Sequence, residues 1–313
     1  MRNEELEMSA YCPSLGNHFS RKAAAVFLSV VMFLPAVLAG CSSAPRRPDE
    51  VFVIRTAATN QLNLANRNAA QGRFEDALTI LKDAWLLVLA TDDPPLRVAA
   101  ATSRGNILFS LGRYTEAFGA WESAAAEGEA ASLGLLAAQA RIYSIRARLV
   151  QLSNAYPEGG QAEADQLRAQ VLREITAVSA DPTVVAAGYL TLAMAEKQMR
   201  RWTEAEDAAV RALRIYERNR FLEDSAYAWF IIASIRSVSG NHDGALEALR
   251  TAIAFDRRAE NGFGLASSWH AMGDVYQNAG RREEARAAHR RAADIYQAIG
   301  LHSKAEELER ILE

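Results

Sequence analysis

The sequence predicts an all-α solenoid of about six antiparallel helix pairs plus a C-terminal capping helix, and three observations support this. No stretch alternates apolar β-branched residues with polar ones, as a strand would. Half of the residues are apolar, and proline is scarce after Pro48. A six-residue pattern ending in alanine also recurs along the chain at nearly constant spacing, which is typical of repeat proteins.

Before the solenoid, the chain begins with the pattern of a cleavable signal peptide. Arg21 and Lys22 precede an uncharged apolar run at residues 23–34. This run is shorter than the roughly 20 residues of a membrane-spanning helix, and small residues follow it. We therefore expect an export signal that is removed. Translation from Met8 is an alternative start, because the lead before the signal is acidic.

The end of the signal resembles the lipobox of bacterial lipoproteins. Leu-Ala-Gly-Cys at 38–41 matches that motif, which implies removal of residues 1–40 as a signal peptide and a diacylglyceryl group on Cys41. An ordinary secretory signal cut near Ala39 is the alternative. By the same resemblance, Ser42 implies sorting to the outer membrane, with the solenoid facing the periplasm.

A lipid-anchored tether, polar and rich in proline, is expected at 41–50, and the solenoid at 51–302. Removal of the signal takes Cys12 with it, so Cys41 is the only cysteine of the mature chain. This excludes an intrachain disulfide and a metal site built from cysteines. The formal net charge of −3 favours no nucleic-acid partner.

Six copies of the recurring pattern carry the fold prediction. Successive copies begin 40, 47, 41, 40 and 40 residues apart. We interpret each copy as a helix that ends at glycine, a bulky residue that fills the turn, and a second helix whose alanine allows close packing. The copies are Gly-Arg-Phe-Glu-Asp-Ala (72–77), Gly-Arg-Tyr-Thr-Glu-Ala (112–117), Gly-Gly-Gln-Ala-Glu-Ala (159–164), Arg-Arg-Trp-Thr-Glu-Ala (200–205), Gly-Asn-His-Asp-Gly-Ala (240–245) and Gly-Arg-Arg-Glu-Glu-Ala (280–285).

These residues resemble the tetratricopeptide repeat, over roughly residues 55–300. The period is nearer 40 than the family's 34, which predicts longer second helices. The pair at 131–178 matches the repeat poorly, and Arg282 and His289 replace aromatic residues of the last unit. That unit shows the signature best, with Trp269, Met272, Gly273, Tyr276, Gly280, Ala285 and Ala292 in register.

The last residues, 303–313, are expected to form a capping helix over the final pair. Ser303 is a candidate N-cap with Glu306 three residues later. The apolar stripe expected to cover the pair consists of Ala305, Leu308, Ile311 and Leu312.

The family resemblance also implies where a partner binds, because the first helix of each pair lines a concave surface. The mixture of amide, apolar and aromatic residues there suits an extended peptide or a helix. The clamp of residues with which some repeat proteins hold a terminal carboxylate is incomplete here, since only Asn66 matches it. The groove candidates are Asn63, Asn66, Thr102, Asn106, Met194, Lys197, Tyr227, Phe230, His270, Asp274 and Gln277, together with Phe109, Leu190 and Ser234.

No catalytic motif is present in the sequence, so we expect neither an enzyme nor a cofactor. His270 and Asp274 share a helix face but lack a third ligand, so we expect no metal site. The leading hypothesis is a membrane-anchored scaffold or adaptor that binds an envelope protein in its groove. The alternative is a lipoprotein that handles a small apolar ligand or serves a transporter. The oligomeric state stays open.

Overall fold

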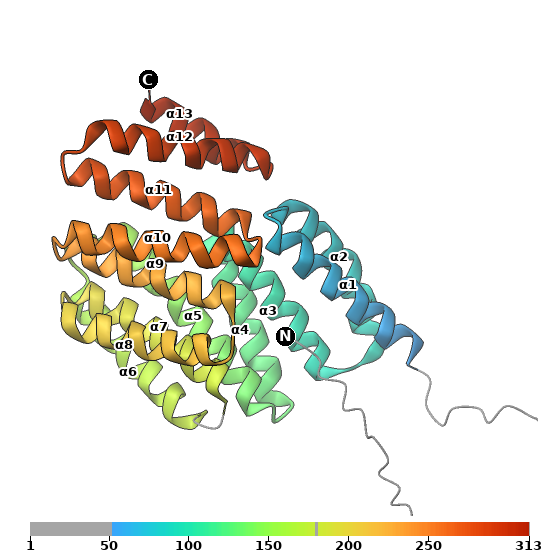
Figure 1. Ribbon diagram of the computed structural model, residues 1–313. Coiled ribbons are helices and arrows are strands. Elements are labelled where there is room, and N and C mark those ends of the chain that lie inside the picture. The colour runs from blue at the N-terminus through green and yellow to red at the C-terminus, as the bar shows by residue number, and fades with distance from the viewer. Residues whose placement is uncertain (1–51, 179–180, 313) are drawn as a thin grey trace, which may run out of the picture. The chain divides into compact units, whose positions relative to one another are not determined.

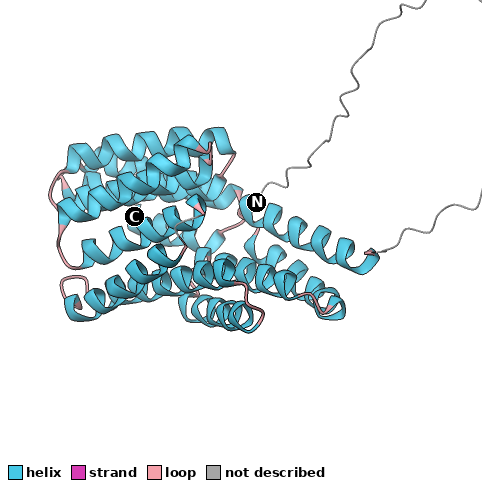
Figure 2. Cartoon of the chain, turned by 90° about the horizontal axis from the view of Figure 1, so that it is seen from below, coloured by secondary structure: helices cyan, strands magenta, loops and turns pink. Residues whose placement is uncertain are grey.

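The computed structural model describes residues 52–178 and 181–312, and every regular element in these ranges is a helix (Figures 1 and 2). The expected signal peptide at 1–40, the lipidated Cys41 and the tether at 41–50 lie outside the described residues.

The described helices form six antiparallel pairs and a final single helix, which confirms the predicted solenoid. Each helix packs on its neighbour along the chain, and α5 also packs on α7. The thirteen helices of this part are α1 (Val53–Ala70), α2 (Phe74–Thr91), α3 (Pro94–Ser110), α4 (Tyr114–Ala130), α5 (Gly134–Ala155), α6 (Gln161–Ala177), α7 (Pro182–Gln198), α8 (Trp202–Arg218), α9 (Leu222–Val238), α10 (His242–Ala259), α11 (Gly262–Asn278), α12 (Arg282–Ala298) and α13 (His302–Leu312).

The long repeat period arises differently from the prediction. The expected lengthening of the second helices alone is wrong, because α3 and α4 both have 17 residues, as do α11 and α12. Both helices of a pair therefore carry the added length. The exception is α5, whose 22 residues account for the wide spacing around the third pair. The repeat period gives only the combined length of the two helices of a pair. It does not show how many residues belong to each helix.

The turns inside the pairs use the predicted left-handed residue. Gly280 has φ +75° and Gly240 has φ +88°, a region that costs glycine little. In the fourth copy Arg200 takes the glycine's place and still adopts φ +58°. An L-residue in this region costs roughly 1–2 kcal/mol, so the repeat geometry imposes the turn even where the sequence disfavours it.

The alanine that ends each pattern allows the two helices of a pair to approach closely. Its side chain is buried in all six copies: Ala77, Ala117, Ala164, Ala205, Ala245 and Ala285. A larger side chain at any of these positions would push the paired helices apart.

A glycine on the first helix makes a similarly close approach. Gly105 of α3 faces the buried indole of Trp121 on α4, and a Cβ on Gly105 would lie 2.3 Å from Trp121 Nε1. The indole donates to the Thr102 carbonyl at 3.3 Å, so its polar atom is satisfied inside the core. Trp121 therefore joins α3 to α4 by packing and by one hydrogen bond.

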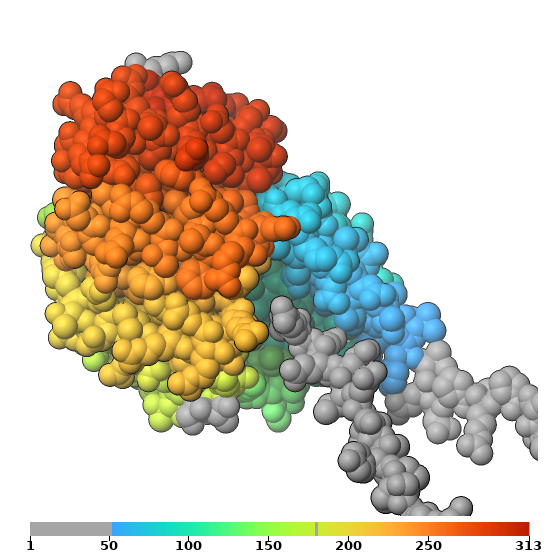
Figure 3. All heavy atoms as spheres, in the orientation of Figure 1, coloured from blue at the N-terminus to red at the C-terminus, as the bar shows by residue number. Residues whose placement is uncertain are grey.

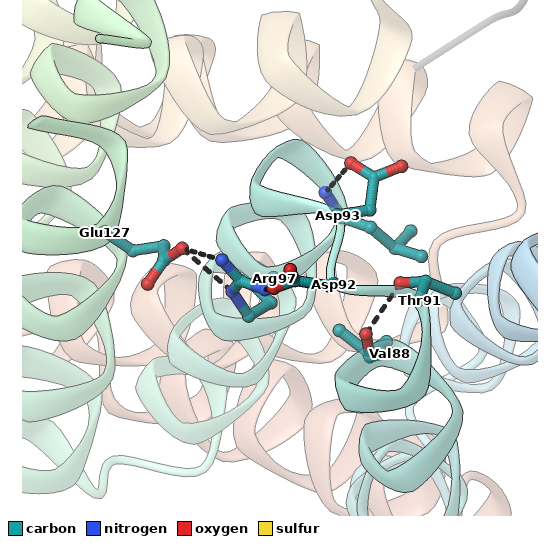
Figure 4. Close-up of polar contacts among 7 residues, drawn as sticks. Val88, Thr91, Asp92, Asp93, Arg97 and Glu127 are labelled. Carbon is teal, nitrogen blue, oxygen red and sulfur yellow. Dashed lines mark hydrogen bonds and ion pairs between the residues drawn. The ribbon is translucent and has the colours of Figure 1, made fainter. Parts of the chain in front are cut away.

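The start of α3 shows how proline and aspartate begin a helix in this fold (Figure 4). Pro94 is its first residue, and the Asp93 carboxylate accepts from the Leu96 N–H at 3.3 Å. Arg97 then donates through Nε and Nη2 to Glu127 of α4 at 2.8 and 2.6 Å, and through Nη1 to Asp92 at 2.8 Å. Arg97 thus links α3 to α4 and also binds Asp92 in the turn before α3.

The first helix pair also contacts the sixth, far along the chain (Figures 1 and 3). Phe74 at the start of α2 meets Phe263 at the start of α11 edge to face, with ring centroids 5.1 Å apart. Gly72 lies against Ile299 after α12, so close that a Cβ would lie 2.9 Å from Ile299 Cδ1. The helices belong to one unit, residues 50–313, and within it these contacts close the curve of the repeats.

The final helix packs on α12, with Ala305 and Leu308 buried against it. Two details differ from the prediction. The helix begins at His302, so Ser303 lies within its first turn instead of at the N-cap. Ile311, which was expected in the buried stripe, is 54% exposed.

Candidate functional site

The closed curve of the repeats surrounds a cavity of about 620 Å³. The first helices of the second to fifth pairs, α3, α5, α7 and α9, supply most of its wall. Residues of α4, Asp256 of α10, the start of α11 and Lys304 of α13 complete it, so the lining extends from the second pair to the final helix. The cavity is therefore formed by several successive pairs together and not by one repeat.

One wall of the cavity is aromatic. Phe109 of α3 packs edge to face on Tyr114 with centroids 5.3 Å apart, and Trp121 lies 5.5 Å from Tyr143 of α5. These four side chains line the cavity. Aromatic rings add contact area with little loss of side-chain freedom, so they suit a binding surface.

The facing wall on α9 carries a second aromatic pair. Tyr227 and Phe230 stack with an interplanar angle of 11° and centroids 6.4 Å apart. Burial raises the pKa of the Tyr227 hydroxyl, so it stays protonated and available as a donor at neutral pH. This pair offers an apolar face with one polar end.

A cation lies between these walls. The Arg146 guanidinium stacks on Tyr143 at 4.9 Å and on Tyr227 at 5.6 Å from the ring centroids. Its Nε is buried without a hydrogen-bond partner among the described residues, and its charge partly offsets the burial that raises the pKa of Asp224. A second cation, Lys197, donates to Ser234 at 3.0 Å, and burial lowers its pKa.

Acidic groups lie on other parts of the lining. Burial raises the pKa of Asp224 and of Glu223 at the start of α9, although both side chains still reach solvent inside the concave space. Asp256 of α10 is 2% exposed, and burial raises its pKa to about 7 while hydrogen bonds from Asn261 and Ser268 lower it. Asn261 Nδ2 donates to it at 2.8 Å. The lining therefore offers apolar contact together with groups of both charge signs.

The structure brings together seven of the groove residues that the sequence predicted. Asn106, Met194, Lys197, Tyr227 and Phe230 line the cavity, and so do Phe109 and Ser234. Lys197 and Ser234 are in addition hydrogen-bonded to each other.

The other predicted residues lie elsewhere. Asn63 and Asn66 are exposed on α1, and Gln277 is exposed on α11. Thr102 and Leu190 take part in helix packing, Thr102 through its carbonyl and Leu190 as a buried core residue. None of these five is part of the cavity lining.

His270 and Asp274 lie outside the cavity lining and have a neighbour that the sequence did not indicate. The expectation that no third ligand accompanies them is wrong, because His289 of α12 lies with them and its Nε2 is 3.0 Å from Asp274 Oδ1. In the sequence, His289 differs from the repeat only by replacing an aromatic side chain.

Sequence reasoning also missed residues of the cavity itself. Arg146 and Tyr143 belong to the third pair, whose poor match to the repeat gave no register from which to place them. Asp256 lies at the end of a second helix, which the family pattern does not direct toward the concave side. The sequence feature that could have indicated Arg146 and Asp256 is a charged residue within an otherwise apolar stretch of a helix.

The described residues include no helix with the length and apolar character that a membrane crossing needs.

Comparisons with known proteins agree with this geometry. Sequence families described as tetratricopeptide repeat match residues 62–134, 185–219 and 224–298. No curated protein matches the chain. These matches confirm the repeat resemblance over most of the solenoid.

Solved structures that are similar to this chain share little sequence with it. A Rap protein complexed with Competence and Sporulation Factor has a TM-score of 0.56 and 14% identity, over 80% of this chain and 72% of that one. BtubC from P. vanneervenii has a TM-score of 0.46 and 18% identity, over 78% and 92% of the two chains. The apo form of RapI has a TM-score of 0.46 and 11% identity, over 82% and 96%. At these identities the similarity concerns the fold alone.

Proposed function

Since the chain belongs to the tetratricopeptide repeat family, we propose that it is a membrane-anchored adaptor of the bacterial cell envelope that holds a segment of a protein partner in its central cavity. Tetratricopeptide repeats are in general non-catalytic interaction scaffolds, so the proposal includes no reaction. The partner is an envelope protein, and nucleic acid is not among the expected ligands.

The observation that carries the proposal is the lining of the cavity. Tyr227 and Phe230 line a concave space together with Arg146, whose buried Nε has no hydrogen-bond partner in the part of the chain that the structure describes. Interfaces are rich in tyrosine and arginine because such side chains combine apolar area with directed hydrogen bonds. A buried donor without a partner costs stability, and a bound segment with an acceptor would remove that cost.

The anchor is the second part of the proposal and is supported by the sequence. Cys41 follows the signal-like run, and the first described helix begins at Val53. The residues between them span at most about 40 Å when fully extended. A diacylglyceryl group on Cys41 would therefore keep the solenoid close to the membrane surface, and Ser42 favours the outer membrane with the solenoid in the periplasm.

Fractionation of cells tests the anchor. The full-length chain should label with a fatty acid and sediment with the outer membrane. Cys41→Ser should lose the label and leave the membrane fraction, while Ser42→Asp should keep the label and move to the inner membrane. Retention of Cys41→Ser in the membrane would contradict lipid anchoring.

Affinity capture after crosslinking tests the adaptor. We expect a tagged full-length chain, recovered from solubilised envelope, to retain one protein that Tyr227→Ala and Phe230→Ala both lose. Tyr156→Ala is the matched control, because this tyrosine is 59% exposed outside the cavity. Circular dichroism of each variant checks that the helices remain. Equal capture by the wild type and both cavity variants would contradict a binding site in the cavity.

The volume of the cavity favours a second candidate function, the handling of a small apolar ligand for a transporter or for storage. A volume of about 620 Å³ lies in the range of small-molecule pockets, and aromatic side chains such as Phe109 and Phe230 line it. Native mass spectrometry of the purified chain separates the two functions. A bound small molecule that Phe230→Ala releases would favour ligand handling, and an empty chain would favour the adaptor.

A further inference from the structure

Three potential metal ligands meet between the two helices of the sixth pair. His270 and Asp274 lie one turn apart on α11, and His289 lies opposite them on α12. The His289 ring packs directly on the α11 backbone at Gly273, where a Cβ would lie 2.1 Å from His289 Cδ2. The absence of a side chain at Gly273 thus allows His289 to reach Asp274.

The distances are close to those of a coordination shell. His289 Nε2 lies 3.0 Å from Asp274 Oδ1, and His270 Nε2 lies 3.9 Å from Asp274 Oδ2. One ligand atom from each residue lies within 4.8 Å of the other two. Ligands of a tetrahedral zinc ion at about 2.1 Å stand about 3.4 Å apart, so modest side-chain rotations would complete the geometry.

The surroundings keep the cluster competent to bind a cation. The His270 and His289 rings meet edge to face with centroids 5.6 Å apart, and the Asp274 carboxylate lies beside both rings and supplies a negative charge. His289 is 2% exposed, but the Asp274 side chain is 57% exposed, so an ion can enter from solvent and keep a water ligand.

We propose that His270, Asp274 and His289 bind one Zn²⁺ ion, or Co²⁺ in its place, between α11 and α12. Two imidazoles and one carboxylate suit these cations, whereas Mg²⁺ and Ca²⁺ require shells made mostly of oxygen. The ion would crosslink the two helices of the last pair. It would also stabilise the folded state, because the unfolded chain holds no such preformed site.

Metal titration of the purified full chain tests the site. Cobalt alone should produce visible absorption with the intensity of a low-coordinate complex and saturate at one ion per chain, and zinc should abolish the absorption. Zinc, but not Mg²⁺, should raise the melting temperature of the apo chain.

Three variants and one control decide the assignment. His270→Ala and Asp274→Asn change partly exposed side chains, and His289→Phe restores the aromatic residue typical of the repeat; each should reduce cobalt affinity at least tenfold. His302→Ala is the control, because His302 is an exposed histidine outside the cluster, bonded to Gln297. If His289→Phe fails to fold, the two surface variants still decide.

Two results would overturn the proposal. The first is a wild-type chain without cobalt absorption and without a zinc-dependent melting temperature, which would make the cluster an ordinary hydrogen-bonded pair beside a third residue. The second is binding that His302→Ala removes and His270→Ala or Asp274→Asn leaves unchanged, which would indicate adventitious surface coordination.

Discussion

Phe74 of α2 and Phe263 of α11 meet edge to face with their ring centroids 5.1 Å apart, although 189 residues separate them in sequence. Leu301, which follows α12, packs against the same apolar cluster. In a linear solenoid each pair touches only its neighbours. Here the first pair also packs on the sixth, and one partner of that contact, Phe263, lines the cavity.

A double-mutant cycle measures the closure. Phe74→Ala should cost about 3–5 kcal/mol of unfolding free energy, because a buried ring is lost. Phe74→Ala and Phe263→Ala should couple by about 0.5–1.5 kcal/mol, as aromatic pairs do. Denaturant unfolding of the two single variants and the double variant gives the coupling. Phe74→Ala with Tyr276→Ala is the control pair and should be additive; additivity of the phenylalanine pair as well would show that the contact contributes nothing.

The left-handed turn at Arg200 predicts a stabilising substitution. Arg200→Gly should raise the unfolding free energy by about 0.5–1 kcal/mol, because glycine adopts φ +58° without the penalty of a Cβ. The converse change, Gly240→Ala at φ +88°, should lower it by about 1–2 kcal/mol, although no atom lies within 4 Å of the added carbon. Thermal unfolding compares the two, and a destabilised Arg200→Gly would refute the conformational argument.

Asp256 predicts a pH dependence of stability. Burial raises its pKa to about 7 in the folded chain, whereas an unfolded aspartate titrates near 3.9. Between these values the folded state binds the proton more tightly, so stability should fall as pH rises from about 4 to about 7. Asp256→Asn should flatten this part of the curve. Unfolding free energies measured across this range for both chains check the prediction, and parallel curves would contradict it.

The final helix, α13, carries a buried leucine and, one turn later, an exposed isoleucine. Leu308 is fully buried, so Leu308→Ala should cost about 2–5 kcal/mol. Ile311 is 54% exposed, and Ile311→Ala should cost less than about 0.5 kcal/mol. Melting temperatures of the two variants provide the comparison. Equal effects would mean that α13 does not cap the last pair through Leu308.

Much of the fold could be predicted from the sequence because the information is local and periodic. Gly280 and Ala285 mark a turn and a close helix contact by their residue types alone, and their recurrence fixes the number of pairs. The closure between Phe74 and Phe263 could not be predicted. It depends on the small rotation between successive pairs, which accumulates along the array. The type of a single residue does not indicate this accumulated rotation.

The candidate site was accessible to sequence reasoning only in part, for the same reason. Tyr227 and Lys197 follow from the register of first helices in well-matched repeats. Arg146 lies in the pair whose register was obscure, and Asp256 lies on a second helix that reaches the cavity near the closure. His289 shows in the sequence only as a departure from an aromatic position, and its meeting with Asp274 requires the packed helices.

The most direct test of the central claim is a photocrosslinker placed inside the cavity. A photoreactive phenylalanine analogue at Phe109, which lines the cavity, should crosslink the full-length chain to one envelope protein in cells. The same analogue at Leu86, 71% exposed on α2 and outside the cavity lining, should not. Crosslinks that form at Leu86 and not at Phe109 would contradict a partner held in the cavity.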